Sequence, residues 1–256
     1  KKIKFPIPKI YNIDINRGII EMEYLKDYDV LTNIFYKKNK YEILKNIMKN
    51  INNLHKYKKK VKREDYIKDL NIEINYKILS RFEKTNWREI KEYNIIKTVN
   101  NKKIKNIQYY LNIINNKIKN IINKKTDFEY NLIHGDIHLG NILIKEDNLC
   151  FIDPRGYFGN SKLYGIKEYD YAKLLFGISG YSIFDNMDID KLTIKNNNLE
   201  ISFIDDYSEF LDNGYFDELV KLLVLTIWLG NNSCFTNNKK KVMSLMTAFY
   251  LCEKYL

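Results

Sequence analysis

Three oxygen-bearing side chains stand at short spacings in and just after the segment "HGDIHLGNIL". Asp136 and Asn141 lie five residues apart, and Asp153 follows twelve residues after Asn141. Two carboxylates and an amide oxygen are hard ligands that suit Mg²⁺, which keeps some of its waters and binds through substrate phosphates. A neighbouring carboxylate that the metal does not use could accept a proton from an attacking hydroxyl group. These residue types therefore point to metal-assisted phosphate chemistry.

The residues between these side chains predict how they come together. Residues 142–145 and 149–152 have the pattern of two short strands joined by a polar turn. Asn141 comes just before the first strand and Asp153 just after the second, so a two-stranded ribbon would place them close together. Asp136 would lie on the loop ahead of them. A lone His-Gly-Asp could also be a simple turn, because Gly and Asp are turn formers, but such a turn leaves Asn141 and Asp153 unexplained.

The order His134-Gly135-Asp136-x-x-x-x-Asn141, followed by Asp153, resembles the catalytic and metal-binding loops of the kinase-like phosphotransferases. The "HGDxHxGNIL" wording is similar to the aminoglycoside phosphotransferase and choline kinase branch. The resemblance implies an α+β, protein-kinase-like fold with a mostly helical large lobe and a small β-ribbon at the catalytic loop. It implies that Asp136 orients the acceptor hydroxyl and takes its proton, while Asn141 and Asp153 hold Mg²⁺ on the phosphates of ATP. His134 would pack beneath the loop as a structural residue.

Two further segments match the same family. The sequence "EMEYL" ends a predicted strand and precedes a helix, like the hinge between the two kinase lobes. By that resemblance Met22 borders the adenine pocket, and the Glu23 carbonyl and the Leu25 amide pair with the adenine edge. Asp170, in "EYDYAKLL", matches the Asp that starts the helix after the activation segment. In the family this residue braces the catalytic loop through backbone hydrogen bonds.

The acceptor implied by the resemblance is a small molecule rather than a protein. Gly135 stands where many regulated protein kinases place an Arg that grips a phosphorylated loop. Only sixteen residues separate Asp153 from Asp170, which leaves little platform for a peptide. The "IDPRGYFG" wording looks like bacterial phosphotransferases of cell-surface polysaccharide or sugar metabolism, so the acceptor would be a sugar, polyol, amino alcohol or aminoglycoside. Arg155 could contact phosphate or an acidic substrate, or pair with a carboxylate of the fold.

The rest of the chain is expected to be mostly helical. The acceptor site would lie in a helical insert at about 28–125, where acidic residues could bind a cationic acceptor or simply be solvated helix charges. These residues are Glu64, Asp65, Asp69 and Glu73. The remaining elements are predicted to be strands at 9–13 and 17–25, a helix over "KEYDYAKLLFGISGY", a hairpin at about 188–205, and helices near 206–229 and 238–255.

The chain departs from the family pattern ahead of the hinge. Only about 20 residues precede it, and they contain a single glycine, Gly18. The Gly-rich phosphate loop and the strand Lys of a kinase small lobe have no counterpart here. We interpret residues 1–25 as the remnant of a small lobe with its hinge, and 26–256 as the large lobe. The missing small lobe is expected upstream in the same polypeptide. An alternative is a catalytically inactive kinase-like module that binds a nucleotide or a partner.

Composition narrows the class of protein. The formal net charge of the 256 residues is +11, but only five of the 43 basic residues are Arg. Arg is the preferred bidentate hydrogen-bond donor to phosphates and base edges. The scarcity of Arg therefore favours a solvated Lys-rich surface over a nucleic-acid site. The three cysteines are widely spaced and form no disulfide or CxxC pattern, which favours a reducing cytoplasm. No apolar run approaches the ~20 residues of a membrane span.

Overall fold

Amphipathic helices make up most of the chain in the computed structural model, which describes residues 4–188, 193–201, 203, 209–212, 214 and 216–256. In α1 the buried residues recur three and four positions apart, so a single apolar face packs on the core. The helices are α1 (Lys40–Leu54), α2 (Arg63–Asn71), α3 (Lys77–Glu83), α4 (Lys91–Ile95), α5 (Ile107–Asn123), α6 (Lys167–Phe176), α7 (Ser182–Asp185), α8 (Glu209–Asp212), α9 (Glu218–Asn231) and α10 (Asn238–Tyr255).

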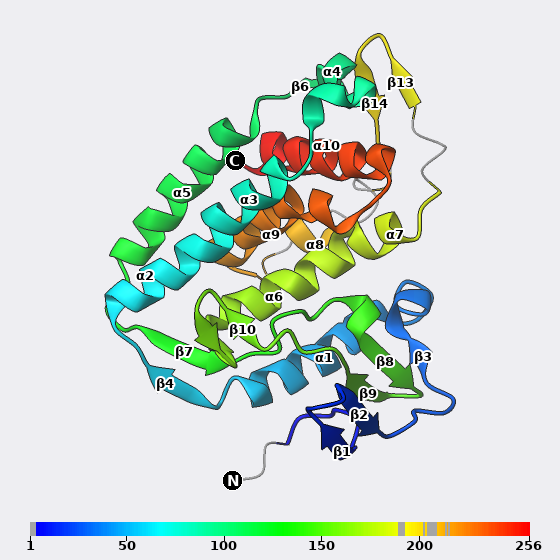
Figure 1. Ribbon diagram of the computed structural model, residues 1–256, viewed down its shortest axis with the longest axis vertical. Coiled ribbons are helices and arrows are strands. Elements are labelled where there is room, and N and C mark those ends of the chain that lie inside the picture. The colour runs from blue at the N-terminus through cyan, green and yellow to red at the C-terminus, as the bar shows by residue number, and fades with distance from the viewer. Residues whose placement is uncertain (1–3, 189–192, 202, 204–208, 213, 215) are drawn as a thin grey trace.

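The centre of the core lies along α9, which packs between α6 and α10 (Figure 1). Almost every residue of α9 is buried, because its sequence "ELVKLLVLTIWLGN" is apolar on most of its circumference. Trp228 is fully buried and packs edge-on against Phe176 of α6, with 4.9 Å between ring centroids. This packing fixes α6 against the rest of the large helical body.

Most of the short strands lie around α1, on the side of α6 that is away from α9, whereas others lie beside α4 (Figure 1). In the sheet that matters most for the site, β8 pairs with both β3 and β9, and the β8–β9 register runs from Ile142 opposite Phe151 to Lys145 opposite Asn148. The strands are β1 (Ile10–Asp14), β2 (Ile19–Met22), β3 (Asp29–Val30), β4 (Lys58–Lys60), β5 (Thr98–Val99), β6 (Lys102–Lys103), β7 (Glu129–Leu132), β8 (Ile142–Lys145), β9 (Asn148–Phe151), β10 (Tyr157–Phe158), β11 (Ser161–Lys162), β12 (Tyr164–Gly165), β13 (Thr193–Lys195) and β14 (Asn198–Glu200).

The predicted ribbon is confirmed, with its first strand at 142–145 and its second beginning one residue early at Asn148. The N-terminal strands are present, although the second is shorter than predicted, at Ile19–Met22. The helix that starts at Lys167 ends at Phe176, because a π-helical turn at Gly177–Tyr181 replaces its predicted last turn. The hairpin expected at about 188–205 forms as β13 and β14, while 189–192, 202 and 204–205 lie outside the described residues.

Two predictions about helical stretches are wrong in detail. The region 28–125 is not continuously helical, because its first α-helix begins only at Lys40, after a short 3₁₀ turn at Leu31–Asn33, and short strands interrupt it. These strands pair with distant segments, as β4 does with β7, and such pairing overrides the local pattern. The single helix expected near 206–229 is divided into α8 and α9, and 206–208, 213 and 215 lie outside the described residues.

One long helix contains an irregular turn. Helices α2 and α3 run on through a π-helical turn at Ile72–Tyr76, so the backbone stays helical from Arg63 to Glu83. π-helical turns occur frequently at functional sites. Within the described portion of the chain, no helix is long and apolar enough to cross a membrane.

Candidate active site

Two backbone hydrogen bonds hold the segment after β9 against the loop before β8. The Ile152 amide donates to the Asn141 carbonyl at 3.0 Å, and the Arg155 amide donates to the His134 carbonyl at 2.8 Å. Asp153 lies between these two anchors, with its side chain exposed and a left-handed φ of 57°. Asp tolerates this conformation better than most residues. The ribbon therefore brings Asp153 alongside the loop that carries Asp136 and Asn141.

Asp170 at the start of α6 holds the same loop from below. Its side chain is completely buried, and it accepts hydrogen bonds from the backbone amides of His134 at 3.0 Å and Gly135 at 2.7 Å. His55 Nε2 lies 3.0 Å from Asp170 Oδ2. Sequence reasoning missed His55, because nothing near it suggested a partner 115 residues away. Gly135 has φ of +83°, which explains why the loop carries a glycine next to His134.

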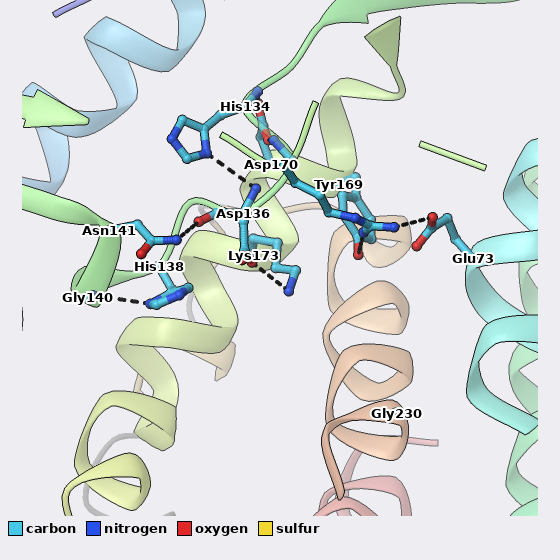
Figure 2. A network of polar contacts seen from close by, with 12 residues as sticks. Glu73, His134, Asp136, His138, Gly140, Asn141, Tyr169, Asp170, Lys173 and Gly230 are labelled. Atoms are coloured by element: carbon cyan, nitrogen blue, oxygen red, sulfur yellow. Dashed lines mark hydrogen bonds and ion pairs between the residues drawn. The ribbon is translucent and has the colours of Figure 1, made fainter. Parts of the chain in front are cut away.

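The side chain of Asn141 joins the two ends of the loop. Its Nδ2 donates to the backbone carbonyl of Asp136 at 3.0 Å, which leaves the amide oxygen as the acceptor atom (Figure 2). His138 caps the short turn between them, since its Nδ1 accepts from the Gly140 amide at 3.1 Å. His138 is thus a structural component of the loop.

The carboxylate of Asp136 is paired with a lysine that the sequence did not point out. Lys173 Nζ of α6 lies 2.8 Å from Asp136 Oδ1, as Figure 2 shows. Burial would raise the pKa of Asp136, but the charge and hydrogen bond of Lys173 outweigh it and hold that pKa below its usual value. Lys173 follows Asp170 by three positions on one helix face. That spacing is the signal that could have identified Lys173.

His134 is enclosed by aromatic rings. Its side chain is only 2% exposed, and the rings of Phe5 and Phe151 stand edge-on to it with centroids at 6.4 and 6.3 Å. Burial lowers the pKa of His134, so the imidazole is neutral near pH 7. Its Nδ1 lies 3.3 Å from the amide nitrogen of Asp136 and accepts from it. The residue packs beneath the loop and orients the backbone at Asp136.

Arg155 pairs with a carboxylate of the fold, which was one of its two possible roles. Its guanidinium lies 2.6 Å from Glu73 Oε1, donates to the Tyr169 hydroxyl at 2.7 Å, and stacks 3.9 Å over the Tyr157 ring. Burial would raise the pKa of Glu73, but Lys77 and Arg155 hold it below its usual value. Glu73 is therefore an ionised anchor between the π-helical turn and the loop after β9.

Asp69, one helical turn before Glu73, anchors the turn between β10 and β11. Its carboxylate accepts from the Asn160 amide and from the Tyr130 hydroxyl, each at 2.8 Å. Asp69 and Glu73 are both buried, so neither is a solvated helix charge nor a free anion that awaits a cationic acceptor. Glu64 and Asp65 are exposed, as the solvated-charge interpretation predicted.

The predicted hinge lies beside β9 at the edge of this site. Phe5 stacks on Phe151 with centroids 4.6 Å apart, and the Phe151 amide donates to the Pro6 carbonyl, which ties the N-terminal hairpin to the ribbon. Met22 is 51% exposed. Within the described residues, the Glu23 carbonyl accepts no hydrogen bond and the Leu25 amide donates none. Both backbone groups are therefore available to a ligand.

Comparison with known proteins addresses the fold. No protein-family model and no curated protein matches the sequence. A solved glucosamine kinase matches with a TM-score of 0.52 at 11% identity, covering 98% of this chain and 65% of that chain. An ethanolamine kinase from Plasmodium vivax matches with a TM-score of 0.52 at 16% identity, covering 98% of this chain and 69% of that chain.

The chain spans less than two thirds of the glucosamine kinase chains that it matches. At these low identities the likeness concerns the path of the backbone and carries no substrate with it. This chain has the protein-kinase-like fold that glucosamine kinase and ethanolamine kinase share.

Proposed function

We propose that this protein transfers the γ-phosphate of ATP to a hydroxyl group of a small molecule. The observation that carries the proposal is the Asp136–Lys173 pair, which lines a cavity beside the loop that Asp170 braces. Two further observations support the proposal: the fold is similar to that of a glucosamine kinase and an ethanolamine kinase, and the loop with Asp136 and Asn141 is hydrogen-bonded to the segment that carries Asp153.

The residues of the proposed metal site fit Mg²⁺ by the chemistry of their atoms. Asn141 offers its amide oxygen and Asp153 an exposed carboxylate, both hard donors. The described residues contain no cluster of three or more His, Cys, Asp or Glu that could hold a metal alone, so substrate phosphates and water would complete its shell. When bound, Mg²⁺ supplies charge neutralisation on the phosphates.

The protein side of the reaction then follows from the geometry. Asp136, kept ionised by Lys173, accepts the proton of the acceptor hydroxyl as the oxygen bonds to the γ-phosphorus and the bond to the β–γ bridging oxygen breaks, which releases ADP. Lys173 also places a positive charge where the transferred group gains negative charge. The Glu23 carbonyl and the Leu25 amide, next to Met22, bind the adenine edge.

The test is phosphate transfer by Asp136→Asn, which removes the base but keeps its shape. We expect turnover of ATP with hydroxyl acceptors to fall by about 10²–10⁴-fold, the usual contribution of a positioned base, with an unchanged melting temperature. The assay follows phosphorylated product by mass spectrometry. Asp127→Asn, which changes an exposed loop carboxylate, is the matched control.

A second variant separates catalysis from structure. Lys173→Met removes the charge that lowers the pKa of Asp136 and leaves the burial that raises it, so the acidic limb of the pH–rate profile should move to higher pH. Near-normal turnover of Asp136→Asn would refute the assigned base. Nucleotide binding without transfer to any acceptor would instead support the alternative, a non-catalytic nucleotide-binding module.

A further inference from the structure

A cavity of about 280 Å³ opens on the side of Asp136 that faces α3 and α9. Its walls include Ile78 and Arg81 of α3, Gly230 of α9, and Tyr157 of β10. Pockets for drug-sized ligands measure roughly 300–1,000 Å³. The cavity is therefore suited to a small acceptor whose hydroxyl reaches Asp136.

The charges that line this cavity are mainly positive. The cations are Lys77, Arg81, Arg155 and Lys173, and the carboxylates are Glu73 and Asp136. Both carboxylates are already engaged: Glu73 lies 2.6 Å from Arg155 and 3.1 Å from Lys77, and Asp136 lies 2.8 Å from Lys173. An excess of positive charge is left in a partly enclosed space.

Arg81 is a cation of this cavity that has no carboxylate partner among the described residues. Its Nη1 donates to the Gly230 carbonyl at 3.2 Å, a neutral partner. No carboxylate of the described residues lies within 4.0 Å of its guanidinium. The remaining donors of this planar fork are suited to bidentate binding of a carboxylate or phosphate.

Lys77 responds to the same surroundings. Burial, together with the charges of Arg155 and Arg81, lowers the pKa of Lys77 to about 8, although Glu73 opposes this shift. Lys77 therefore still holds its proton at neutral pH. An amine in this cavity would meet the repulsion that Lys77 already experiences, whereas an anion would relieve it.

The residues of the proposed metal site lie outside this cavity. Neither Asn141 nor Asp153 lines the cavity. In Figure 2, Asn141 and Glu73 lie on opposite sides of Asp136. An anionic group bound beside Arg81 thus belongs to the acceptor rather than to the nucleotide.

We propose that the acceptor is a small hydroxyl compound that carries an anionic group, either a carboxylate or a phosphate. This inference rests on the proposed function. This group pairs with Arg81 at the wall formed by α3 and α9, and the hydroxyl faces Asp136. A cationic acceptor, such as an amino alcohol or an aminoglycoside, is disfavoured by the same charges.

The test compares four three-carbon compounds that differ mainly in one group: glycerol, serinol with an ammonium, glycerate with a carboxylate, and glycerol 3-phosphate. Dissociation constants are measured by calorimetry for the wild-type chain and for Arg81→Gln. We expect at least one anion to bind about 10-fold more tightly than glycerol and serinol, the effect of one charge-assisted pair. Arg81→Gln should abolish that difference, and the glycerate and phosphate arms show which anion is preferred.

Two control variants keep the result interpretable. Arg88→Gln removes the same charge at an exposed position outside the cavity and should leave the preference unchanged. Arg81→Lys retains the charge and should keep most of the preference, which separates charge from loss of folding. The proposal is wrong if neither anion binds more tightly than glycerol, if serinol binds as tightly, or if Arg81→Gln leaves the anion affinity unchanged.

Transfer assays distinguish this inference from the function on which it rests. If the anions bind as expected but receive no phosphate from ATP, the phosphotransferase proposal fails while the anion site stands. If serinol or an aminoglycoside is phosphorylated in preference to the anions, the transferase stands and the acceptor class proposed here is wrong.

Discussion

Two antiparallel ribbons of this protein, β1–β2 and β8–β9, both contain many apolar residues but have opposite surroundings. Nearly every residue of β1 and β2 is exposed, whereas both strands of the second ribbon are largely buried. The difference comes from neighbours: β8 pairs with β3, and β9 receives Phe5 against Phe151. Strand pattern alone therefore does not decide burial, and only the covered ribbon can position chemistry with precision.

The largest expected effect compares one side chain from each ribbon. Phe151→Ala should lower the free energy of unfolding by about 3–5 kcal/mol, because it leaves a cavity at a fully buried position. Ile20→Ala, at a position 54% exposed, should change it by at most about 1 kcal/mol. Urea denaturation measures both. Equal losses of unfolding free energy would contradict the difference in burial between the ribbons and show that the first ribbon is covered in solution.

A second comparison concerns two carboxylates, Asp170 and Glu23, that accept hydrogen bonds from backbone amides. Asp170→Ala leaves the buried amides of His134 and Gly135 without an acceptor and should cost roughly 2–4 kcal/mol. The Glu23 carboxylate accepts a hydrogen bond from the amide of Lys9 at the exposed end of the first ribbon, so Glu23→Ala should change stability little. Thermal and urea unfolding test the pair, and a stable Asp170→Ala protein would refute the bracing role.

The smallest effect is expected at the open edge of the first ribbon. Met22 is 51% exposed and Tyr24 is 87% exposed, so the adenine edge of this chain would be enclosed on one side only. We expect these 256 residues to bind MgATP with a dissociation constant above about 100 µM, or less than roughly 5.5 kcal/mol of binding free energy. A calorimetric titration that gave a low-micromolar constant would contradict this.

The features of the site that the sequence predicted are those linked over short distances along the chain. The strand–turn–strand at 142–152 and the loop from Asp136 to Asn141 are local, so spacing and turn residues were enough to place them. The fold class followed from the same motif. Helix boundaries in 28–125 were less predictable, because pairing of β4 with β7 depends on residues about 70 positions apart.

The contacts that tune the site join distant segments and left no local signal. Arg155 and Glu73 are 82 positions apart, and His55 and Asp170 are 115 apart. From the sequence, Glu73 had two possible environments, solvent or a cationic acceptor, and the structure shows a third, an ion pair with the loop after β9. The charge of the cavity could be assessed only after these pairs were known.

The π-helical turn at Ile72–Tyr76 has a consequence for insertions and deletions. Asp69, Glu73, Lys77 and Arg81 recur at every fourth residue, and in a regular α-helix each such step turns the side chain by about 40°. Three steps would separate Asp69 and Arg81 by about 120° around the axis, and the wider turn offsets some of that rotation. Loss of one residue there, with a regular helix restored, would leave Arg81 eleven residues after Asp69, only about 20° past three full turns, so the two side chains would stay in phase and the segment should tolerate this one deletion.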